Sequence, residues 1–269
     1  MWDWSENQMK KQMGYIGNTE FRNADVSQSM KKEQTGTREI CMTFIRHGAT
    51  ASNREGRYLG KTDESLSEEG TKALQQYKEA KGYPVADILF SSPMKRCLET
   101  VQVLYPGQTR IPIQITEWTE MDFGAFEGHN YKELSGDPGY QQWIDSGGTM
   151  PFPKGESREE FIQRSVVGFE HMLQDLRMRH RFVGESEPSN RDWGKGSITE
   201  QEYPAYKERE KEIQNVSAVV HGGTIMALLS HFLGGDYFEY QVKCGQGYTG
   251  RLVFTQGTKE PVWVDWKTL

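Results

Sequence analysis

The sequence has few cysteines and no long hydrophobic run, and both features restrict the kind of protein it can be. Its 269 residues include 3 cysteines, which are far apart and form no C-x-x-C pair. This spacing argues against a disulfide framework and against a zinc ribbon. The longest uninterrupted apolar run, Ile225 to Leu229, is much shorter than the roughly 20 residues of a membrane-spanning helix. Residues 1–6 contain no apolar signal core, so we expect a cytoplasmic protein without a membrane partner.

An excess of positive charge is also missing. The formal net charge is −6 at pH 7, and a negatively charged protein repels the phosphate backbone of nucleic acids. We therefore expect no nucleic-acid partner. Any phosphate chemistry must depend on a local group of basic side chains.

Hydrophobic residues are scarce as well, at 35% of the chain, and two polar stretches account for this. Residues 1–39 show no sustained helix or strand period, so they are interpreted as a polar N-terminal appendage. Between Gly184 and Glu212, 13 of 29 residues are charged, and prolines and glycines interrupt any regular pattern. This stretch is interpreted as a charged insertion, at about 184–212, in a single domain that spans residues 40–269.

Outside these stretches, strand patterns alternate with helix patterns. Apolar runs predict strands at Cys41–Ile45, Val85–Phe90, 111–115 (at an edge) and Val216–Val220, and further strands around Val242, at Leu252–Phe254 and at Val262–Val264. Helices are predicted after the capping signals Ser67, Ser92-Pro93 and Ser157 with Glu160, and from Thr224 to Phe232. This order is typical of an α/β protein, a three-layer α/β/α sandwich with a mostly parallel central sheet.

Two of the predicted strands end in a histidine followed by a glycine. His47 follows the first strand, and His221 follows the strand that ends at Val220. In open parallel sheets the ligand crevice lies beyond the carboxyl ends of the strands. We therefore expect both histidines at the functional site.

Four segments, in order along the chain, resemble motifs of the histidine phosphatase superfamily, the phosphoglycerate-mutase-like proteins. They are Arg46-His47-Gly48-Ala49-Thr50 with Asn53, the run Ser91–Arg96, the run Glu120–Gly128, and His221-Gly222-Gly223. The resemblance covers about residues 40 to 265, apart from the insertion. It implies that residues 40–269 form the catalytic domain of a metal-independent enzyme that needs no cofactor.

The resemblance also implies a role for each catalytic residue. His47 matches the nucleophile that forms a phosphohistidine, and Glu120 matches the acid that protonates the leaving oxygen and later acts as a base on water. His221 would contact the phosphate when protonated. A neutral imidazole is a good nucleophile near pH 7.

Phosphate contacts are expected from two arginines, one at the end of the first strand and one in the first turn of the helix after Ser92-Pro93. The planar guanidinium groups of Arg46 and Arg96 can each bind two phosphate oxygens and stay charged. Asn53, Thr50 and the backbone amide of Gly222 are expected to add uncharged donors.

Three features of the sequence favour hydrolysis over mutase activity. Mutases of this family hold a second phosphate with basic residues, whereas residues 128–153 contain Lys132 as their only lysine or arginine. The run Pro153–Ser157 resembles the Pro-x-Gly-Glu-Ser element of the phosphatase branch, which includes α-ribazole phosphatases. An aromatic leaving-group pocket is expected from Phe123, Phe126, Tyr131, Tyr140 and Trp143.

We therefore predict a phosphomonoesterase that acts on a small phosphorylated metabolite, with α-ribazole phosphate as one candidate substrate. Phosphoglycerate mutase and a catalytically silent phospholigand-binding regulatory protein are the alternatives. Ala49 stands where many relatives have Glu or Gln, which predicts altered substrate choice with retained activity. Glu127 is predicted to brace a loop through hydrogen bonds.

Overall fold

The computed structural model describes residues 37–80, 82–107, 111–179, 213–255 and 258–269. The predicted insertion lies outside the described residues, as does the predicted N-terminal appendage except for residues 37–39, which begin the first strand. In the described part of the chain, no helix is long and apolar enough to span a membrane.

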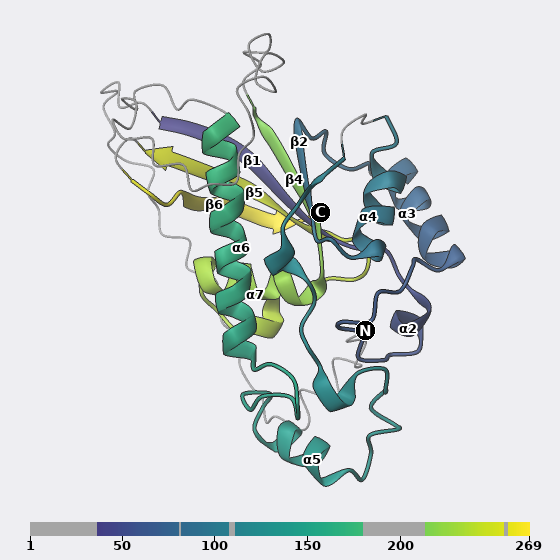
Figure 1. Cartoon of the computed structure of the whole chain (residues 1–269). Coiled ribbons are helices and arrows are strands. Elements are labelled where there is room, and N and C mark those ends of the chain that lie inside the picture. The colour runs from purple at the N-terminus through teal and green to yellow at the C-terminus, as the bar shows by residue number, and fades with distance from the viewer. Residues whose placement is uncertain (1–36, 81, 108–110, 180–212, 256–257) are drawn as a thin grey trace, which may run out of the picture.

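A six-stranded sheet lies at the centre of the described fold (Figure 1). Its order is β3-β2-β4-β1-β5-β6, and the strands are β1 (Thr37–Arg46), β2 (Ile88–Ser91), β3 (Ile113–Gln114), β4 (Asn215–Val220), β5 (Gly247–Thr255) and β6 (Val262–Thr268). The pairings among β1 to β4 are parallel, whereas β5 and β6 add antiparallel strands at one edge. The predicted mostly parallel sheet is confirmed, and so is the edge position of β3.

Helices cover both faces of this sheet, which confirms the predicted three-layer sandwich. They are α2 (Ala51–Arg54), α3 (Glu68–Ala80), α4 (Lys95–Leu104), α5 (Pro138–Asp145), α6 (Arg158–Arg179) and α7 (Gly222–Leu233). Helices α3 and α4 lie on one face of the sheet, and α6 and α7 lie on the other (Figure 1). Short 3-10 helices, η1 (Thr116–Trp118), η2 (Gly124–Phe126) and η4 (Tyr237–Tyr240), occupy the connections.

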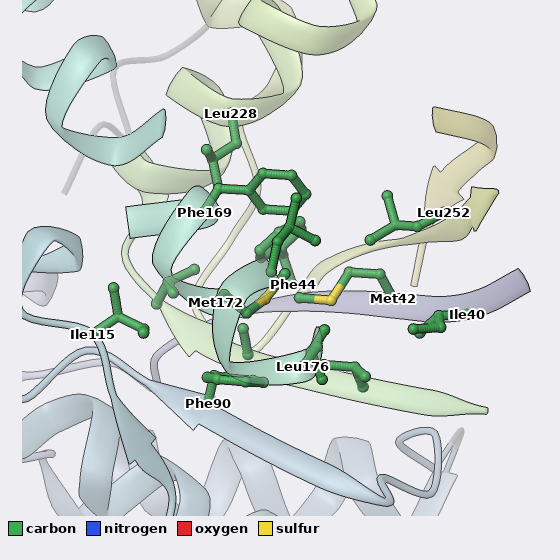
Figure 2. Close-up of a cluster of buried hydrophobic side chains, with 14 of the residues drawn as sticks. Ile40, Met42, Phe44, Phe90, Ile115, Phe169, Met172, Leu176, Leu228 and Leu252 are labelled. Carbon is green, nitrogen blue, oxygen red and sulfur yellow. The ribbon is translucent and has the colours of Figure 1, made fainter. Parts of the chain in front are cut away.

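The alternation of side chains along β1 builds two separate cores. Met42 and Phe44 pack against Phe169 of α6 and Leu228 of α7 (Figure 2), whereas Ile45 packs on the opposite face with α3 and α4. Burying an apolar side chain of this size contributes about 1.5–3 kcal/mol. A third, aromatic cluster packs around Tyr58, Phe123 and Trp143, and brings α5 together with the loop that follows β3.

Two predicted strands differ from the structure. The strand predicted at Val85–Phe90 begins only at Ile88, and Val85 is 78% exposed. No strand forms around Val242, because its carbonyl accepts a hydrogen bond from Arg46 Nη1 at 2.6 Å instead of joining a strand ladder.

The sheet register places the ends of β1 and β4 side by side. Arg46 pairs with Val220 in the parallel ladder, so the next residues, His47 and His221, emerge together at the carboxyl edge of the sheet. The same edge receives Ser92 after β2, whose last residue pairs with Val219. The sheet topology therefore defines where a site can form.

Candidate active site

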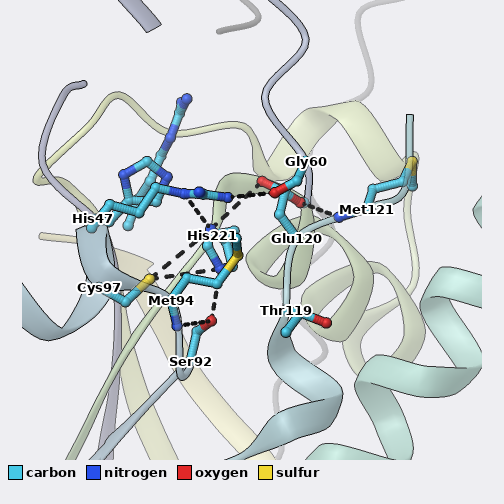
Figure 3. A network of polar contacts seen from close by, with 12 residues as sticks. His47, Gly60, Ser92, Met94, Cys97, Thr119, Glu120, Met121 and His221 are labelled. Carbon is cyan, nitrogen blue, oxygen red and sulfur yellow. Dashed lines mark hydrogen bonds and ion pairs between the residues drawn. The ribbon is translucent and has the colours of Figure 1, made fainter. Parts of the chain in front are cut away.

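His47 and His221 lie in contact at the carboxyl edge of the sheet. Their ring centroids are 5.1 Å apart, with an angle of 67° between the ring planes. Both side chains are almost completely buried. Figure 3 shows His221 between His47 on one side and Glu120 on the other.

The hydrogen bond of His47 determines which ring nitrogen is available for chemistry. Its Nδ1 lies 2.7 Å from the carbonyl oxygen of Gly48, and a carbonyl oxygen only accepts hydrogen bonds. The proton of a neutral ring is therefore on Nδ1, so Nε2 carries the lone pair that could attack an electrophile.

The surroundings of His47 also keep its ring uncharged. Burial lowers the pKa of His47 well below its usual 6.5, and the positive charges of Arg96 and Arg46 lower this pKa further. A neutral imidazole is the form in which a histidine side chain can act as a nucleophile. Geometry and electrostatics thus agree on a neutral ring with a free Nε2.

His221 is held by partners on both of its nitrogens. Arg96 Nε donates to Nδ1 at 3.3 Å, so the ring proton must be on Nε2, which lies 2.8 Å from the hydroxyl of Ser92. Burial and the neighbouring Arg96 lower the pKa of His221 well below 6.5. In this state His221 is neutral and accepts from Arg96, whereas the sequence predicts a protonated His221 that contacts the phosphate.

Ser92 is therefore a site residue that the sequence pattern did not identify. Ser92-Pro93 predicts the start of a helix, but α4 begins at Lys95 with Met94 at the N-cap position. The hydroxyl of Ser92 accepts from Met94 N at 3.4 Å and also contacts His221, which is 129 residues away in the sequence. A local capping signal cannot reveal a contact of this range.

Cys97, on the first turn of α4, lies beside the same histidine. Its Sγ is 3.7 Å from His221 Nε2, and the side chain is fully buried. Burial raises the pKa of Cys97 to about 12. The group is a neutral thiol at any physiological pH.

Arg96 connects the histidines to the loop that contains Gly60 and Thr62. Its Nη2 donates to Gly60 O at 2.9 Å, and its Nη1 donates to Thr62 O at 2.8 Å. The carboxylate of Glu127 accepts from the backbone N–H groups of the same two residues, at 2.9 and 3.0 Å. Glu127 thus braces a loop, as its sequence context predicts. A guanidinium has five N–H donors, so two donors of Arg96 remain for a ligand.

Arg46, the last residue of β1, precedes His47 and is almost completely buried. Its Nη1 is bound to Val242 O, whereas its buried Nε has no acceptor among the described residues. Leaving a buried donor without a partner costs about 1–3 kcal/mol. This cost is recovered when an anion binds beside it.

Helix α7 begins within this group, and its first two residues must be small. A Cβ on Gly222 would lie 3.2 Å from Arg46 Nε, and a Cβ on Gly223 would lie 2.5 Å from Glu120 Oε1. The two glycines let the first N–H groups of α7 approach the histidines and arginines. These N–H groups lack helical acceptors and carry partial positive charge.

Glu120 approaches the histidines from the loop after η1. One oxygen accepts from Met121 N at 3.0 Å, and the other lies 3.9 Å from His221 Nδ1 (Figure 3). Burial raises the pKa of this carboxyl above its usual value, although nearby arginines partly oppose the change. A carboxyl with a raised pKa is suited to donate a proton near neutral pH.

Asn53 and Thr50 are buried at the start of α2, where they cap the helix. Asn53 N donates to the hydroxyl of Thr50, and Asn53 Oδ1 accepts from Thr50 N, both at 3.2 Å. This capping box occupies the amide oxygen of Asn53 and leaves its Nδ2 donor group outside the box. The cap accounts for the burial of Thr50 without a ligand.

A pocket opens beside Glu120 and Gly223. It is lined by Glu120, Met121, Phe123, Trp143, Gly148, Phe152, Arg158, Gly223, Met226, Tyr237 and Phe238. Of the aromatic residues expected in such a pocket, Phe123 and Trp143 are present. Phe126 and Tyr140 pack in the aromatic core instead, and Tyr131 is largely exposed.

No metal centre is evident in the ranges that the structure describes. Within them, no group of three or more His, Cys, Asp or Glu side chains is placed to bind a metal ion. The groups that converge at the sheet edge are instead two histidines, two arginines and a carboxyl.

Comparisons with known proteins agree with this arrangement. The profile of the histidine phosphatase superfamily (branch 1) matches residues 42–183. The chain is 28% identical to phosphoserine phosphatase 1 of Hydrogenobacter thermophilus over 143 residues, which cover 52% of this chain and 66% of that protein. It is 26% identical to 2,3-bisphosphoglycerate-dependent phosphoglycerate mutase of Corynebacterium efficiens over 203 residues, which cover 71% of this chain and 75% of that protein.

A solved structure has the same fold. The putative α-ribazole-5′-P phosphatase of Escherichia coli matches with a TM-score of 0.60 at 20% identity, covering 84% of this chain and 94% of that chain. At this identity the likeness supports the fold alone.

Proposed function

Because the chain belongs to the histidine phosphatase superfamily (branch 1), we propose that it hydrolyses a small phosphomonoester through a phosphohistidine on His47. The observation that carries this proposal is the state of His47. It is a buried, neutral ring whose Nδ1 proton is held by Gly48 O, which leaves Nε2 free, and the positive charges of Arg96 and Arg46 act on this ring. Members of the superfamily act as phosphatases or mutases, and this arrangement suits the phosphoryl transfer that both require.

The first step transfers the phosphoryl group to the enzyme. Nε2 of His47 attacks phosphorus, the bond between phosphorus and the alcohol oxygen breaks, and the proton of Glu120 passes to that oxygen. Negative charge spreads over the equatorial phosphate oxygens in the transition state. The free donors of Arg46 and Arg96 stabilise this charge, because they are held in place before the reaction.

The second step releases phosphate. The Glu120 carboxylate takes a proton from water, the water oxygen attacks phosphorus, and the bond between phosphorus and His47 Nε2 breaks. Glu120 regains its proton and the neutral ring of His47 is restored. The amides at the start of α7, the Nδ2 group of Asn53 and the hydroxyl of Thr50 serve as further phosphate donors in this proposal. Ser92 and His221 keep Arg96 in position.

Two observations favour hydrolysis over the mutase reaction. Lys132, the only lysine or arginine of residues 128–153, does not line the pocket beside Glu120. A relative outside the mutases, phosphoserine phosphatase 1, matches this chain. Within this class α-ribazole phosphate is a candidate substrate, supported by the Pro153–Ser157 element.

The test is hydrolysis of p-nitrophenyl phosphate by the wild-type protein with and without EDTA. We expect turnover that EDTA does not reduce, and we expect it to vanish in His47→Ala. His231→Ala, at the exposed end of α7, is the matched control and should retain activity. A phosphoenzyme that still forms in His47→Ala would exclude the proposed nucleophile.

A substrate screen then separates the alternatives. It compares release of inorganic phosphate from α-ribazole phosphate, phosphoserine, nucleotides and sugar phosphates with isomerisation of 3-phosphoglycerate. Isomerisation faster than hydrolysis would indicate a mutase. Phosphate binding without turnover would indicate a regulatory protein.

A further inference from the structure

Arg158, the first residue of α6, is a cation that the phosphoryl-transfer scheme does not use. It lines the same pocket as Glu120. Its guanidinium carbon lies 5.6 Å from the ring centre of Tyr237 and 6.0 Å from that of Phe238. Among the described residues, this half-buried guanidinium has aromatic partners but no hydrogen-bond acceptor or carboxylate partner. It therefore has donors available to a ligand.

The acidic neighbours of Arg158 on the helix have other partners. Glu160 accepts from the backbone and hydroxyl of Ser157 at 2.8 Å, and Glu159 accepts from Gln163 at 3.0 Å. A cation at the amino end of a helix is also unfavourable, because the helix dipole places positive charge there. Helix stability thus gives no reason for an arginine at this position.

The aromatic rings connect Arg158 to the reacting end of the pocket. The Tyr237 hydroxyl donates to Gly223 O at 3.4 Å, and Gly223 is the residue whose Cβ would collide with the Glu120 carboxyl. Arg158 thus stacks on a ring whose far end reaches the backbone beside the proposed acid. An alcohol group that receives its proton from Glu120 would extend toward Arg158.

We propose that Arg158 determines substrate specificity by binding a carboxylate on the alcohol part of the phosphomonoester. This inference rests on the phosphatase function proposed above, and it favours a carboxylate-bearing ester over α-ribazole phosphate, whose alcohol part has no carboxylate. The planar fork of an arginine matches the two oxygens of a carboxylate. Arg158 is the only cation among the residues that line the described pocket, so a singly charged carboxylate fits it better than a second phosphate dianion. The rest of the lining is largely apolar and suits a short carbon chain.

The test uses two phosphomonoesters that differ mainly in the carboxylate. 3-Phosphoglycerate carries a carboxylate where sn-glycerol 3-phosphate carries a hydroxymethyl group, and release of inorganic phosphate is measured for both. Hydrogen bonds to a charged group contribute about 1.5–3 kcal/mol, so kcat/KM of the wild-type protein should favour 3-phosphoglycerate by about 10-fold or more.

Variants then assign this preference to Arg158. Arg158→Gln should bring the ratio of the two kcat/KM values close to one, and Arg158→Lys should keep only part of the preference. Arg251→Gln removes an arginine on β5 that pairs with Glu39, away from the pocket, and should leave the ratio unchanged. Because the readout is a ratio measured on one preparation, partial unfolding of a variant does not imitate the effect.

The outcomes separate this inference from the function on which it rests. If the wild-type protein hydrolyses p-nitrophenyl phosphate and both test substrates without preference, the role of Arg158 is wrong and the phosphatase proposal stands. A wild-type preference that persists in Arg158→Gln also contradicts the role of Arg158. If no phosphomonoester is hydrolysed, both proposals fail.

Discussion

At the scale of single residues, the site is defined by which groups are charged in the free protein. Both buried histidines have pKa values well below 6.5, mainly because burial penalises the imidazolium, whereas burial raises the pKa of Glu120. The proposed nucleophile is thus ready as a neutral base, and the proposed acid tends to keep its proton. Each group is in the state that the first step requires.

These pKa shifts predict the pH dependence of kcat/KM. His47 reacts when neutral, and its lowered pKa means that it stays neutral as pH falls through 6.5. Glu120 reacts when protonated, so activity should fall as pH rises through its raised pKa. After correction for ionisation of the substrate, we expect the acid limb of the profile below pH 6.5. A fall in kcat/KM on acidification with its midpoint at or above pH 6.5 would contradict a neutral His47.

The role of Glu120 predicts a dependence on the leaving group. General acid catalysis contributes about 10²- to 10⁴-fold, and it matters most for a poor leaving group. Glu120→Gln should therefore reduce kcat/KM, which reports the transfer to His47, for an alkyl phosphate much more than for p-nitrophenyl phosphate, whose phenolate leaves readily. Steady-state kinetics with both substrates check this. Near-normal turnover of the alkyl phosphate would remove Glu120 from the role of acid.

At the scale of elements, the amino-terminal half of α6 holds the loop that carries Glu120. Arg164 Nη1 donates to the carbonyls of Glu117 and Thr119 at 2.6 and 2.9 Å, and its Nη2 donates to Glu156 at 2.6 Å. Glu156 in turn accepts from Asp122 N at 2.9 Å. This ion pair thus binds the loop on both sides of Glu120.

Arg164 is therefore predicted to position Glu120 without touching the substrate. Arg164→Met removes the donors of two loop carbonyls and leaves Glu156 without its cationic partner, and the loss of a partner costs about 1–3 kcal/mol for a buried polar group. We expect a lower kcat with little change in KM, and a larger effect for alkyl phosphates than for p-nitrophenyl phosphate. A matched loss for both substrates would indicate general unfolding instead. Arg164→Lys should restore part of the activity.

At the scale of the whole molecule, the sequence predicts the strands that position the site better than it predicts the side-chain contacts within the site. The apolar runs that end at Ile45 and Val220 identify β1 and β4, because buried parallel strands leave a strong local pattern. Because these two strands pair in parallel, the prediction that His47 and His221 lie at the same edge of the sheet is confirmed. The contact of Ser92 with His221 and that of Arg46 with Val242 join distant segments, and no local pattern encodes them.

Arg158 illustrates a second limit. A charged residue at the start of a helix is usually interpreted as solvent-exposed, and only the packing of Tyr237 and Phe238 reveals its place in the pocket. The same holds for the aromatic residues. Phe126 and Tyr140 are aromatic residues of the kind that line ligand pockets, but in the fold they pack inside the aromatic core.

The stability of the whole sandwich is predicted to depend strongly on Phe44. This side chain is fully buried near the C-terminal end of β1 and stacks against Trp263 and Trp266 of β6. Replacing a buried phenylalanine by alanine costs about 3–5 kcal/mol. We expect Phe44→Ala to lower the free energy of unfolding by this amount in chemical denaturation. A loss below about 1 kcal/mol would mean that this core is not the one that holds the sheet.

The buried thiol of Cys97 beside His221 predicts how the activity responds to oxidants. Peroxide and alkylating reagents attack the thiolate, and burial keeps Cys97 protonated with a pKa of about 12. The nucleophile of the proposed reaction is a ring nitrogen, which these reagents do not oxidise. Millimolar hydrogen peroxide should therefore leave turnover of p-nitrophenyl phosphate intact, as measured against an enzyme that uses a cysteine thiolate.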